Sequence, residues 1–187
     1  ISIDTRKASV LKAALSSGAD ILNDISALED DDAIGLLAAE ADIPVVLMHK
    51  RGNPLTMQKQ TEYADVIDEV KTYLQKRFDY ALTCGIKSEK IILDPGIGFG
   101  KDVYANLMLI KNCGVFASLS EEFRSNHVLM ALSRKTCIGE ITGRSVEQRL
   151  AGTLSANLLA VQKGATIIRV HDTKETIDIL KVLRDIG

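Results

Sequence analysis

Six short apolar runs in this 187-residue chain each end at polar side chains that can take part in chemistry. The polar groups are carboxylates, an amide, imidazoles and cations, which together can bind a polar heterocycle beside an anion. Because they recur at the ends of similar runs, they predict one active site built from many segments. They are Asp4, Asn23 with Asp24, His49, Asp94, Ser133-Arg134-Lys135, and Arg169 with His171.

The runs that carry these groups are too short for helices and are typical of buried strands. They cover residues 1–3, 20–22, 44–48, 90–93, 128–132 and 165–168. Apolar stripes with helical spacing lie between several of them, over residues 10–15, 63–81, 150–161 and 177–183. This alternation predicts a parallel sheet covered by helices, a class that binds ligands at the carboxyl ends of its strands.

The number of units favours a barrel that is only partly contained in this chain. We expect a single α/β domain over residues 1–187 with six βα units. A (β/α)8 TIM barrel has eight units and typically about 250 residues. Because residue 1 falls inside a strand and the chain ends on a helix, we expect the first two units upstream. An open, doubly wound sheet of six strands is the alternative architecture.

Composition and residue spacing argue against several kinds of partner and site. The net charge is -2 and no long Lys/Arg run is present, which argues against nucleic acid or an anionic membrane as a partner. No apolar stretch approaches the roughly 20 residues of a membrane helix. The cysteines form no C-x-x-C pair and the histidines have no zinc spacing. We therefore expect a soluble cytoplasmic protein that binds small molecules.

The segment from Asp94 to Lys101 is the densest motif. It is not a dinucleotide fingerprint, because G-x-G-x-x-G would need glycine at Lys101. It is not a P-loop, which would need glycine at Pro95 and a hydroxyl at Asp102. A strand-end carboxylate followed by three glycines lets the backbone approach a flat ligand. A glycine-rich turn in which Asp94 bonds only its own loop is the alternative.

Two later motifs predict an anion site. Residues 133–136 follow an apolar strand and open a short helix, whose N-terminus, with Ser133 and Lys135, could bind an anionic group. Ser133 acting only as a helix N-cap is the alternative. Arg169 and His171 alternate along a strand, so both project to one side and could donate to a phosphate or pyrophosphate.

The remaining polar residues of the set divide between ligand binding and local structure. Asp4 and Asn23 could read the edge of a polar heterocycle. Asp24 is interpreted as a turn or cap residue, and Asp172 as the N-cap of the last helix. His49 begins a polar loop over residues 50–61, which is expected to move over the site.

Taken together, these segments resemble dihydropteroate synthase, a folate-pathway enzyme family, and they occur in the family's order. The matching pieces are Ile3-Asp4-Thr5, Ile21-Leu22-Asn23-Asp24-Ile25, Leu47-Met48-His49 with Gly52-Asn53-Pro54, Leu93 through Lys101, Ser133-Arg134-Lys135, and Arg169-Val170-His171-Asp172. The resemblance implies a TIM barrel that condenses 6-hydroxymethyl-7,8-dihydropterin pyrophosphate with p-aminobenzoate and releases pyrophosphate. It also implies a homodimer, Mg²⁺ and a target of sulfonamides.

The resemblance further implies a role for each matching residue. The pterin would be held by Asp4, Asn23, Met48, Asp94, Phe99 and Lys135. Arg169 and His171 would bind the pyrophosphate, while Ser133 and Lys135 would lie near the aminobenzoate carboxylate. The expected metal ligand is an asparagine of the family that has no counterpart in these residues.

The chain also departs from the family pattern. An Asn-Val-Thr-Pro-Asp-Ser-Phe type loop and a Ser-Thr-Arg-Pro type loop are absent, and Ala131 stands where many relatives have glycine. Two alternatives therefore stay open. One is a methyltetrahydrofolate methyltransferase on a related barrel, although a methyl donor brings no pyrophosphate for Arg169 and His171. The other is a non-catalytic pterin-binding or partner protein.

Overall fold

The computed structural model describes residues 1–52, 61–117, 119 and 127–186, in which strands alternate with helices. The strands are β1 (Ser2–Asp4), β2 (Ile21–Asp24), β3 (Val45–Met48), β4 (Ile91–Asp94), β5 (Leu129–Met130) and β6 (Ile167–Ile168). The helices are α1 (Ala8–Ser16), α2 (Asp32–Glu40), α3 (Val66–Thr83), α4 (Val103–Lys111), α5 (Thr136–Thr142), α6 (Leu150–Gln162) and α7 (Thr173–Ile186). Short 3-10 turns cover Ser88–Lys90, Cys113–Ala117 and Val146–Gln148.

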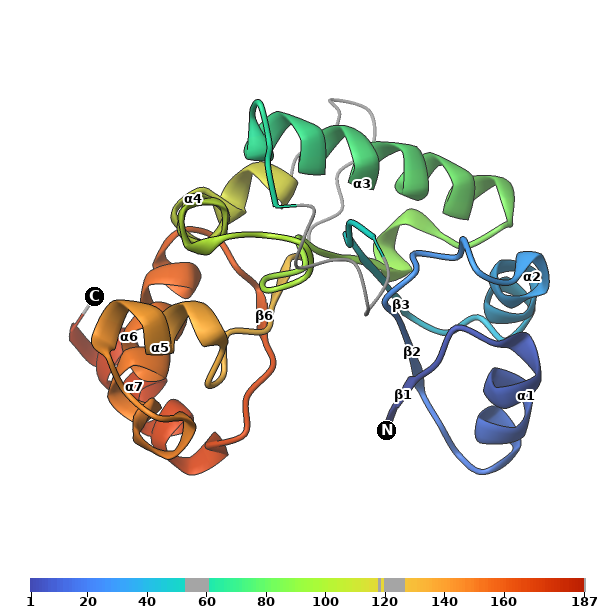
Figure 1. Cartoon of the computed structure of the whole chain (residues 1–187). Coiled ribbons are helices and arrows are strands. Elements are labelled where there is room, and N and C mark those ends of the chain that lie inside the picture. The colour runs from blue at the N-terminus through green and yellow to red at the C-terminus, as the bar shows by residue number, and fades with distance from the viewer. Residues whose placement is uncertain (53–60, 118, 120–126, 187) are drawn as a thin grey trace.

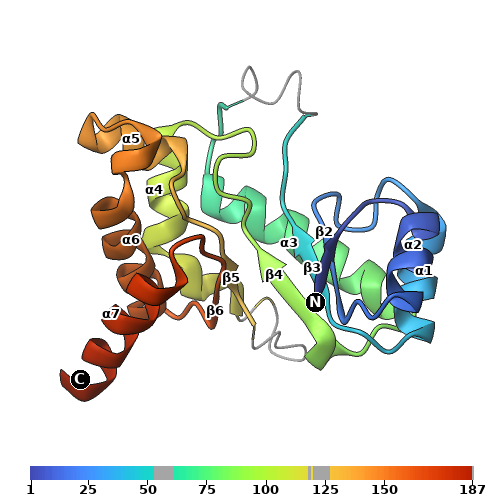
Figure 2. The same cartoon turned by 90° about the horizontal axis from the view of Figure 1, so that it is seen from below.

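The strands are parallel, and neighbours in space are neighbours in sequence. One sheet has the order β1-β2-β3-β4 and a second has β5-β6. A parallel bridge between Leu93 and Val128 joins the two sheets. A doubly wound sheet reverses its strand order at a switch point, so this unbroken order fits a barrel and contradicts the open-sheet alternative. The helices form an arch outside the strands (Figure 1), and a second view shows β2, β3 and β4 side by side (Figure 2).

The pleat of the strands divides the core into two layers. Leu22, Leu47 and Leu93 point outward and are fully buried against the helices. Val46, Ile92 and Leu129 point inward and form a separate cluster inside the barrel, packed by Ile21, Ala131 and Ile167. Because successive side chains alternate between faces, the position two residues after an inward apolar residue also points inward. These inward positions at the strand ends carry the polar groups.

Helix α3 illustrates how the outer layer forms. Asp65 caps it by accepting hydrogen bonds from the backbone N–H groups of Ile67 at 2.9 Å and Asp68 at 3.1 Å. The inner face of the helix is buried, with Val70, Leu74 and Ala81 of the predicted stripe and Phe78 in addition. The chain turns after the helix at Gly85, whose φ of 92° favours glycine. No helix in the described ranges is long and apolar enough to cross a membrane.

The observed boundaries differ from the predicted ones in several places. Strands β5 and β6 are shorter than the predicted runs 128–132 and 165–168, with two residues each. Strands β1, β2 and β4 extend to their polar residues, so Asp4, Asn23 and Asp94 are members of strands and are aimed by the pleat. Helices α2 and α4 were not predicted, because nearly every residue of each is apolar and no polar face defines a stripe.

Candidate active site

The inward strand ends meet in a cavity of about 160 Å³ at the carboxyl edge of the sheet. It is lined by Asp4, Asn23, Ile25, Met48, Asp94, Gly96, Ile97, Phe99, Leu129, Ala131, Lys135 and Arg169. The six residues predicted to hold a pterin are all in this lining. Arg169 joins them from the position directly after β6, so Asp4 and Arg169, which are 165 positions apart, line one cavity. Ser133 and His171 do not line it.

Asp4 and Asn23 form a polar pair at the ends of β1 and β2. The two residues are register partners, and the Asn23 amide nitrogen Nδ2 donates to Asp4 Oδ2 at 3.0 Å. This bond fixes the Asn23 amide so that its oxygen is available as an acceptor. The pair therefore offers a carboxylate and an amide oxygen to N–H groups of a ligand.

Asp94 is the most deeply buried carboxylate of the cavity, with 5% of its surface exposed. Its Oδ1 accepts the Gly96 N–H at 2.7 Å. Burial raises the pKa of Asp94 to about 6, although the Gly96 bond and the charges of Lys135, Lys101 and Arg169 oppose the rise. The local turn predicted as an alternative is thus present, but the carboxylate also lines the cavity. It changes charge close to neutral pH.

Lys135 approaches the cavity from the loop after β5. Its Nζ donates to the Ile97 carbonyl at 2.7 Å and lies 4.7 Å from the centre of the Phe99 ring. Burial lowers its pKa, while the negative charge of Asp94 acts in the opposite direction. A cation and an aromatic wall are therefore held beside the buried carboxylate.

The loops after β5 and β6 are joined by hydrogen bonds. Ser133 Oγ accepts the His171 backbone N–H at 3.2 Å, and Arg134 donates to Asp172 at 3.2 Å from Nε and 2.6 Å from Nη2. The N-cap interpretation of Ser133 is wrong, because α5 begins at Thr136 with Lys135 at its N-cap. Asp172 lies at the start of α7 as predicted, but its carboxylate binds Arg134.

The loop after β2 is stabilised by Asp24, which is fully buried. Its carboxylate accepts from the Ser26 N–H and hydroxyl and from the Leu28 N–H, at 2.7, 2.6 and 2.9 Å. The prediction of a turn residue is confirmed. Most of the expected covering loop, residues 53–60, lies outside the described residues.

Sequence reasoning missed Lys101, which is buried under the glycine-rich loop with only 4% of its surface exposed. It figured in the prediction as the end of the glycine-rich motif and as the residue that breaks a nucleotide fingerprint, but without a role of its own. Arg149 was missed as well; it donates to the Arg134 carbonyl at 3.0 Å. Gly139 leaves room for it, since a Cβ there would lie 2.2 Å from Arg149. No local signal identifies either residue, because each also depends on a distant partner, His49 for Lys101 and Arg134 for Arg149.

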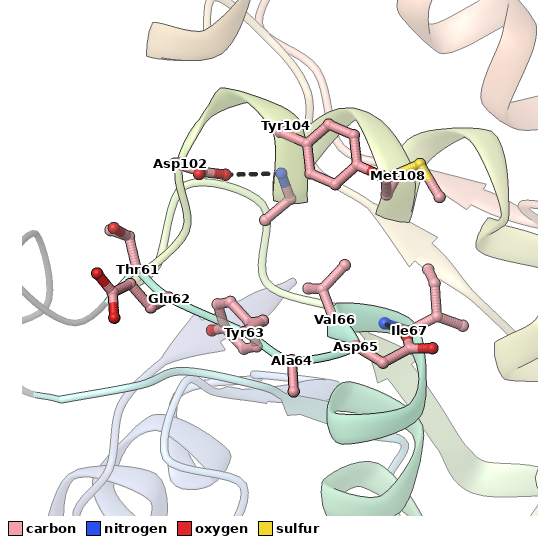
Figure 3. Close-up of a pocket in the computed structure, with 11 residues that line it drawn as sticks. Thr61, Glu62, Tyr63, Ala64, Asp65, Val66, Ile67, Asp102, Tyr104 and Met108 are labelled. Carbon is pink, nitrogen blue, oxygen red and sulfur yellow. Dashed lines mark hydrogen bonds between the residues drawn. The ribbon is translucent and has the colours of Figure 1, made fainter.

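A larger groove of about 560 Å³ lies between the start of α3 and the start of α4, outside the barrel (Figure 3). Two of its three carboxylates are engaged as helix caps: Asp65 caps α3, and Asp102 caps α4 by accepting the Ala105 N–H at 2.7 Å. No strand end opens into it. We therefore place the site in the smaller cavity, where the polar strand ends converge.

The described residues contain no group of three or more His, Cys, Asp or Glu side chains able to hold a metal ion. Asp4 and Asp94 are the carboxylates of the cavity lining, and they are accompanied by Lys135 and Arg169. This mixture of acceptors and cations suits a polar ligand that carries both N–H donors and an anionic group.

Comparison with known proteins identifies close relatives. The family model "Pterin binding enzyme" matches residues 1–171. The dihydropteroate synthase of Haemophilus influenzae is 43% identical over 182 residues, which are 97% of this chain and 64% of that protein. Two solved structures are similar: the Xanthomonas albilineans dihydropteroate synthase in complex with 7,8-dihydropteroate (TM-score 0.89, 39% identity, 99% of this chain and 66% of that one) and the Thermus thermophilus enzyme in complex with 6HMPPP (TM-score 0.90, 38% identity, 98% and 71%). The chain thus spans about two thirds of the length of these relatives.

Proposed function

The chain belongs to the pterin-binding enzyme family, and on that premise we propose that it carries most of the pterin and pyrophosphate site of a dihydropteroate synthase. The observation that carries the proposal is the convergence of Asp4, Asn23, Asp94, Lys135 and Arg169 on one cavity. The relatives reported above are named dihydropteroate synthases, which favours this reaction over methyl transfer.

We assign the chemistry of the cavity by matching donors to acceptors. The Asp94 carboxylate and the Asn23 amide oxygen accept N–H groups from the aminopyrimidinone edge of the pterin. Lys135 donates to its carbonyl, and Met48 and Phe99 enclose the ring. Arg169 and His171 bind the pyrophosphate, and Ser133 with Lys135 faces the aminobenzoate carboxylate.

The transfer itself exchanges one bond for another. The amine nitrogen of p-aminobenzoate attacks the methylene carbon on the pterin, and a carbon–nitrogen bond forms. The carbon–oxygen bond to pyrophosphate breaks, pyrophosphate leaves with the electron pair, and the nitrogen loses a proton. Asp94 stabilises positive charge that develops on the pterin methylene, while Arg169 stabilises the departing anion.

Binding of Mg²⁺ is implied by the family resemblance and stays a proposal. Mg²⁺ commonly binds substrate phosphates with one or two carboxylates and several waters. The described residues form no metal-binding group of their own, so no step is assigned to the ion. A homodimer, a cytoplasmic location and inhibition by sulfonamides likewise remain predictions.

The proposal is tested by incubating the full-length protein with 6-hydroxymethyl-7,8-dihydropterin pyrophosphate and p-aminobenzoate. We expect 7,8-dihydropteroate and pyrophosphate in equal amounts, detected by mass spectrometry and a phosphate assay after pyrophosphatase. Omitting either substrate controls for breakdown of the pterin. Pyrophosphate release that does not depend on aminobenzoate would contradict the proposed transfer.

The pKa of Asp94 predicts how pterin binding changes with pH. Because the pKa is about 6, we expect affinity to rise as pH increases from 5 to 7 and then to level off, since only the ionised carboxylate accepts two N–H groups. The contribution of Asp94 to folding stability changes with pH in the opposite direction. The pKa of Asp94 in the folded protein lies above the ordinary value of 3.8, so the protonated carboxyl group stabilises the folded state, fully so below pH 3.8. This contribution is lost as the pH rises through about 6.

Calorimetric titration with the pterin substrate at intervals of half a pH unit measures the binding profile, and urea unfolding at the same pH values measures stability. Affinity that is constant from pH 5 to 7 would show that Asp94 does not receive the pterin edge.

A further inference from the structure

The ammonium group of Lys101 is buried beneath the loop that joins β4 to α4 and has three acceptors. Its Nζ lies 2.9 Å from the Gly96 carbonyl oxygen, 3.0 Å from the Phe99 carbonyl oxygen and 2.9 Å from His49 Nδ1. An ammonium group has three hydrogens, so these contacts satisfy every donor that it carries. The two carbonyls belong to the loop that presents Phe99 to the cavity and whose Gly96 N–H binds the Asp94 carboxylate.

His49 is the acceptor that comes from outside the loop. It follows β3, is 5% exposed, and lies edge-on to Tyr73 with ring centres 4.9 Å apart. Its backbone N–H donates to the Asp94 carbonyl at 2.9 Å. Burial, together with the charges of Lys101 and Arg51, lowers the pKa of His49 to about 2. The imidazole therefore stays neutral, and accepting at Nδ1 requires its hydrogen to be on Nε2.

Further contacts hold the same loop in place, from Asn106 of α4 and from the backbone of His49 after β3. The Gly98 N–H donates to Asn106 Oδ1 at 2.7 Å, and Asn106 Nδ2 donates to the Lys101 carbonyl at 3.2 Å. A Cβ at Gly96 would lie 1.8 Å from the His49 carbonyl oxygen, so the backbones touch there. The loop thus rests on Lys101 and His49, while its Ile97 carbonyl receives Lys135 on the cavity side.

From this geometry we propose that Lys101 and His49 act as a buried positioning pair, which holds the loop in the shape that places Phe99 at the pterin and the Gly96 N–H on the Asp94 carboxylate. This inference rests on the proposed function. Burial of an ammonium group is unfavourable, and good hydrogen bonds offset this only in part. Burial also lowers the pKa of Lys101 to about 7, although Asp94 opposes the shift. A buried cation is thus an unfavourable means of stabilising a loop by packing alone. What it supplies, and an apolar side chain could not, is a set of three directed hydrogen bonds.

The pair is tested with substitutions that separate hydrogen bonding from packing. Asparagine at position 49 keeps an acceptor near the place of Nδ1 but removes the ring, whereas phenylalanine keeps the ring beside Tyr73 and removes the acceptor. Lys101→Met removes the ammonium group at similar length. Lys87→Met is the matched control, because Lys87 is exposed and pairs with Asp42 on the surface. Calorimetric titration with 6-hydroxymethyl-7,8-dihydropterin pyrophosphate gives the affinity, and circular dichroism confirms folding.

We expect Lys101→Met and His49→Phe to weaken pterin binding about tenfold or more, equivalent to about 1.4 kcal/mol. His49→Asn should bind about tenfold tighter than His49→Phe, and Lys87→Met should bind like the wild type. A role in packing alone predicts the reverse order at position 49. That reverse order, or wild-type affinity in Lys101→Met, would overturn the positioning role. If Lys101→Met does not fold, the order at position 49 decides. If the wild-type protein itself does not bind the pterin, the proposed function fails instead.

Discussion

Replacing Asp94 with asparagine is expected to weaken binding of the pterin substrate about a hundredfold, equivalent to about 2.7 kcal/mol. The carboxylate is 5% exposed, and among the described residues its only hydrogen-bond donor is the Gly96 N–H, which binds Oδ1. Its other oxygen can accept from the ligand. Asparagine has the same shape, but it replaces one acceptor by an N–H₂ group. It also removes the charge, and hydrogen bonds to a charged group contribute about 1.5–3 kcal/mol each.

Titration of Asp94→Asn with the pterin substrate measures this loss, and the rise in affinity between pH 5 and 7 should disappear as well. Asp79→Asn is the matched control, since Asp79 is exposed on α3 and accepts from Gln75. Affinity within about twofold of the wild type, a difference of about 0.4 kcal/mol, would remove Asp94 from the binding site.

Replacing Lys135 with methionine is expected to lower kcat/KM at least about a hundredfold, because a charge-assisted donor to the substrate is lost. Lys135 Nζ donates to the Ile97 carbonyl, lies over the face of Phe99, and belongs to the lining of the cavity that we propose binds the pterin. Methionine retains much of the apolar stem. The effect is therefore assigned to the ammonium group.

Steady-state formation of 7,8-dihydropteroate with each substrate varied in turn checks this expectation. Lys12→Met provides the control, because Lys12 is exposed on the outer helix α1. Turnover of Lys135→Met close to that of the control would contradict the assigned role.

Much of the barrel could be predicted from local patterns. Short apolar runs separated by amphipathic stripes are typical of βα repeats, and the order of strands in space follows from that repetition. The alternation of a strand also explains why Asp4, Asn23 and Asp94 lie together. Each stands two positions after an inward residue on a parallel strand, so the pleat aims all three at one cavity.

Features that depend on distant partners could not be predicted. Lys101 and His49 are separated by 52 positions, and Arg134 and Asp172 by 38. Nothing near Lys101 in the sequence distinguishes a buried cation from an exposed one, because its burial depends on how the loop rests on β3. Arg134 likewise has a φ of 55°, a left-handed conformation that depends on its tertiary bonds.

We propose that six strand ends form one pterin and pyrophosphate site, and a crystal structure of the full-length protein with 6-hydroxymethyl-7,8-dihydropterin pyrophosphate tests this most directly. We expect the ring between Met48 and Phe99, its N–H edge within hydrogen-bond distance of Asp94, and its pyrophosphate beside Arg169. Electron density for the ligand in the outer groove between α3 and α4, or a pterin in the barrel without contact to Asp94, would contradict the claim.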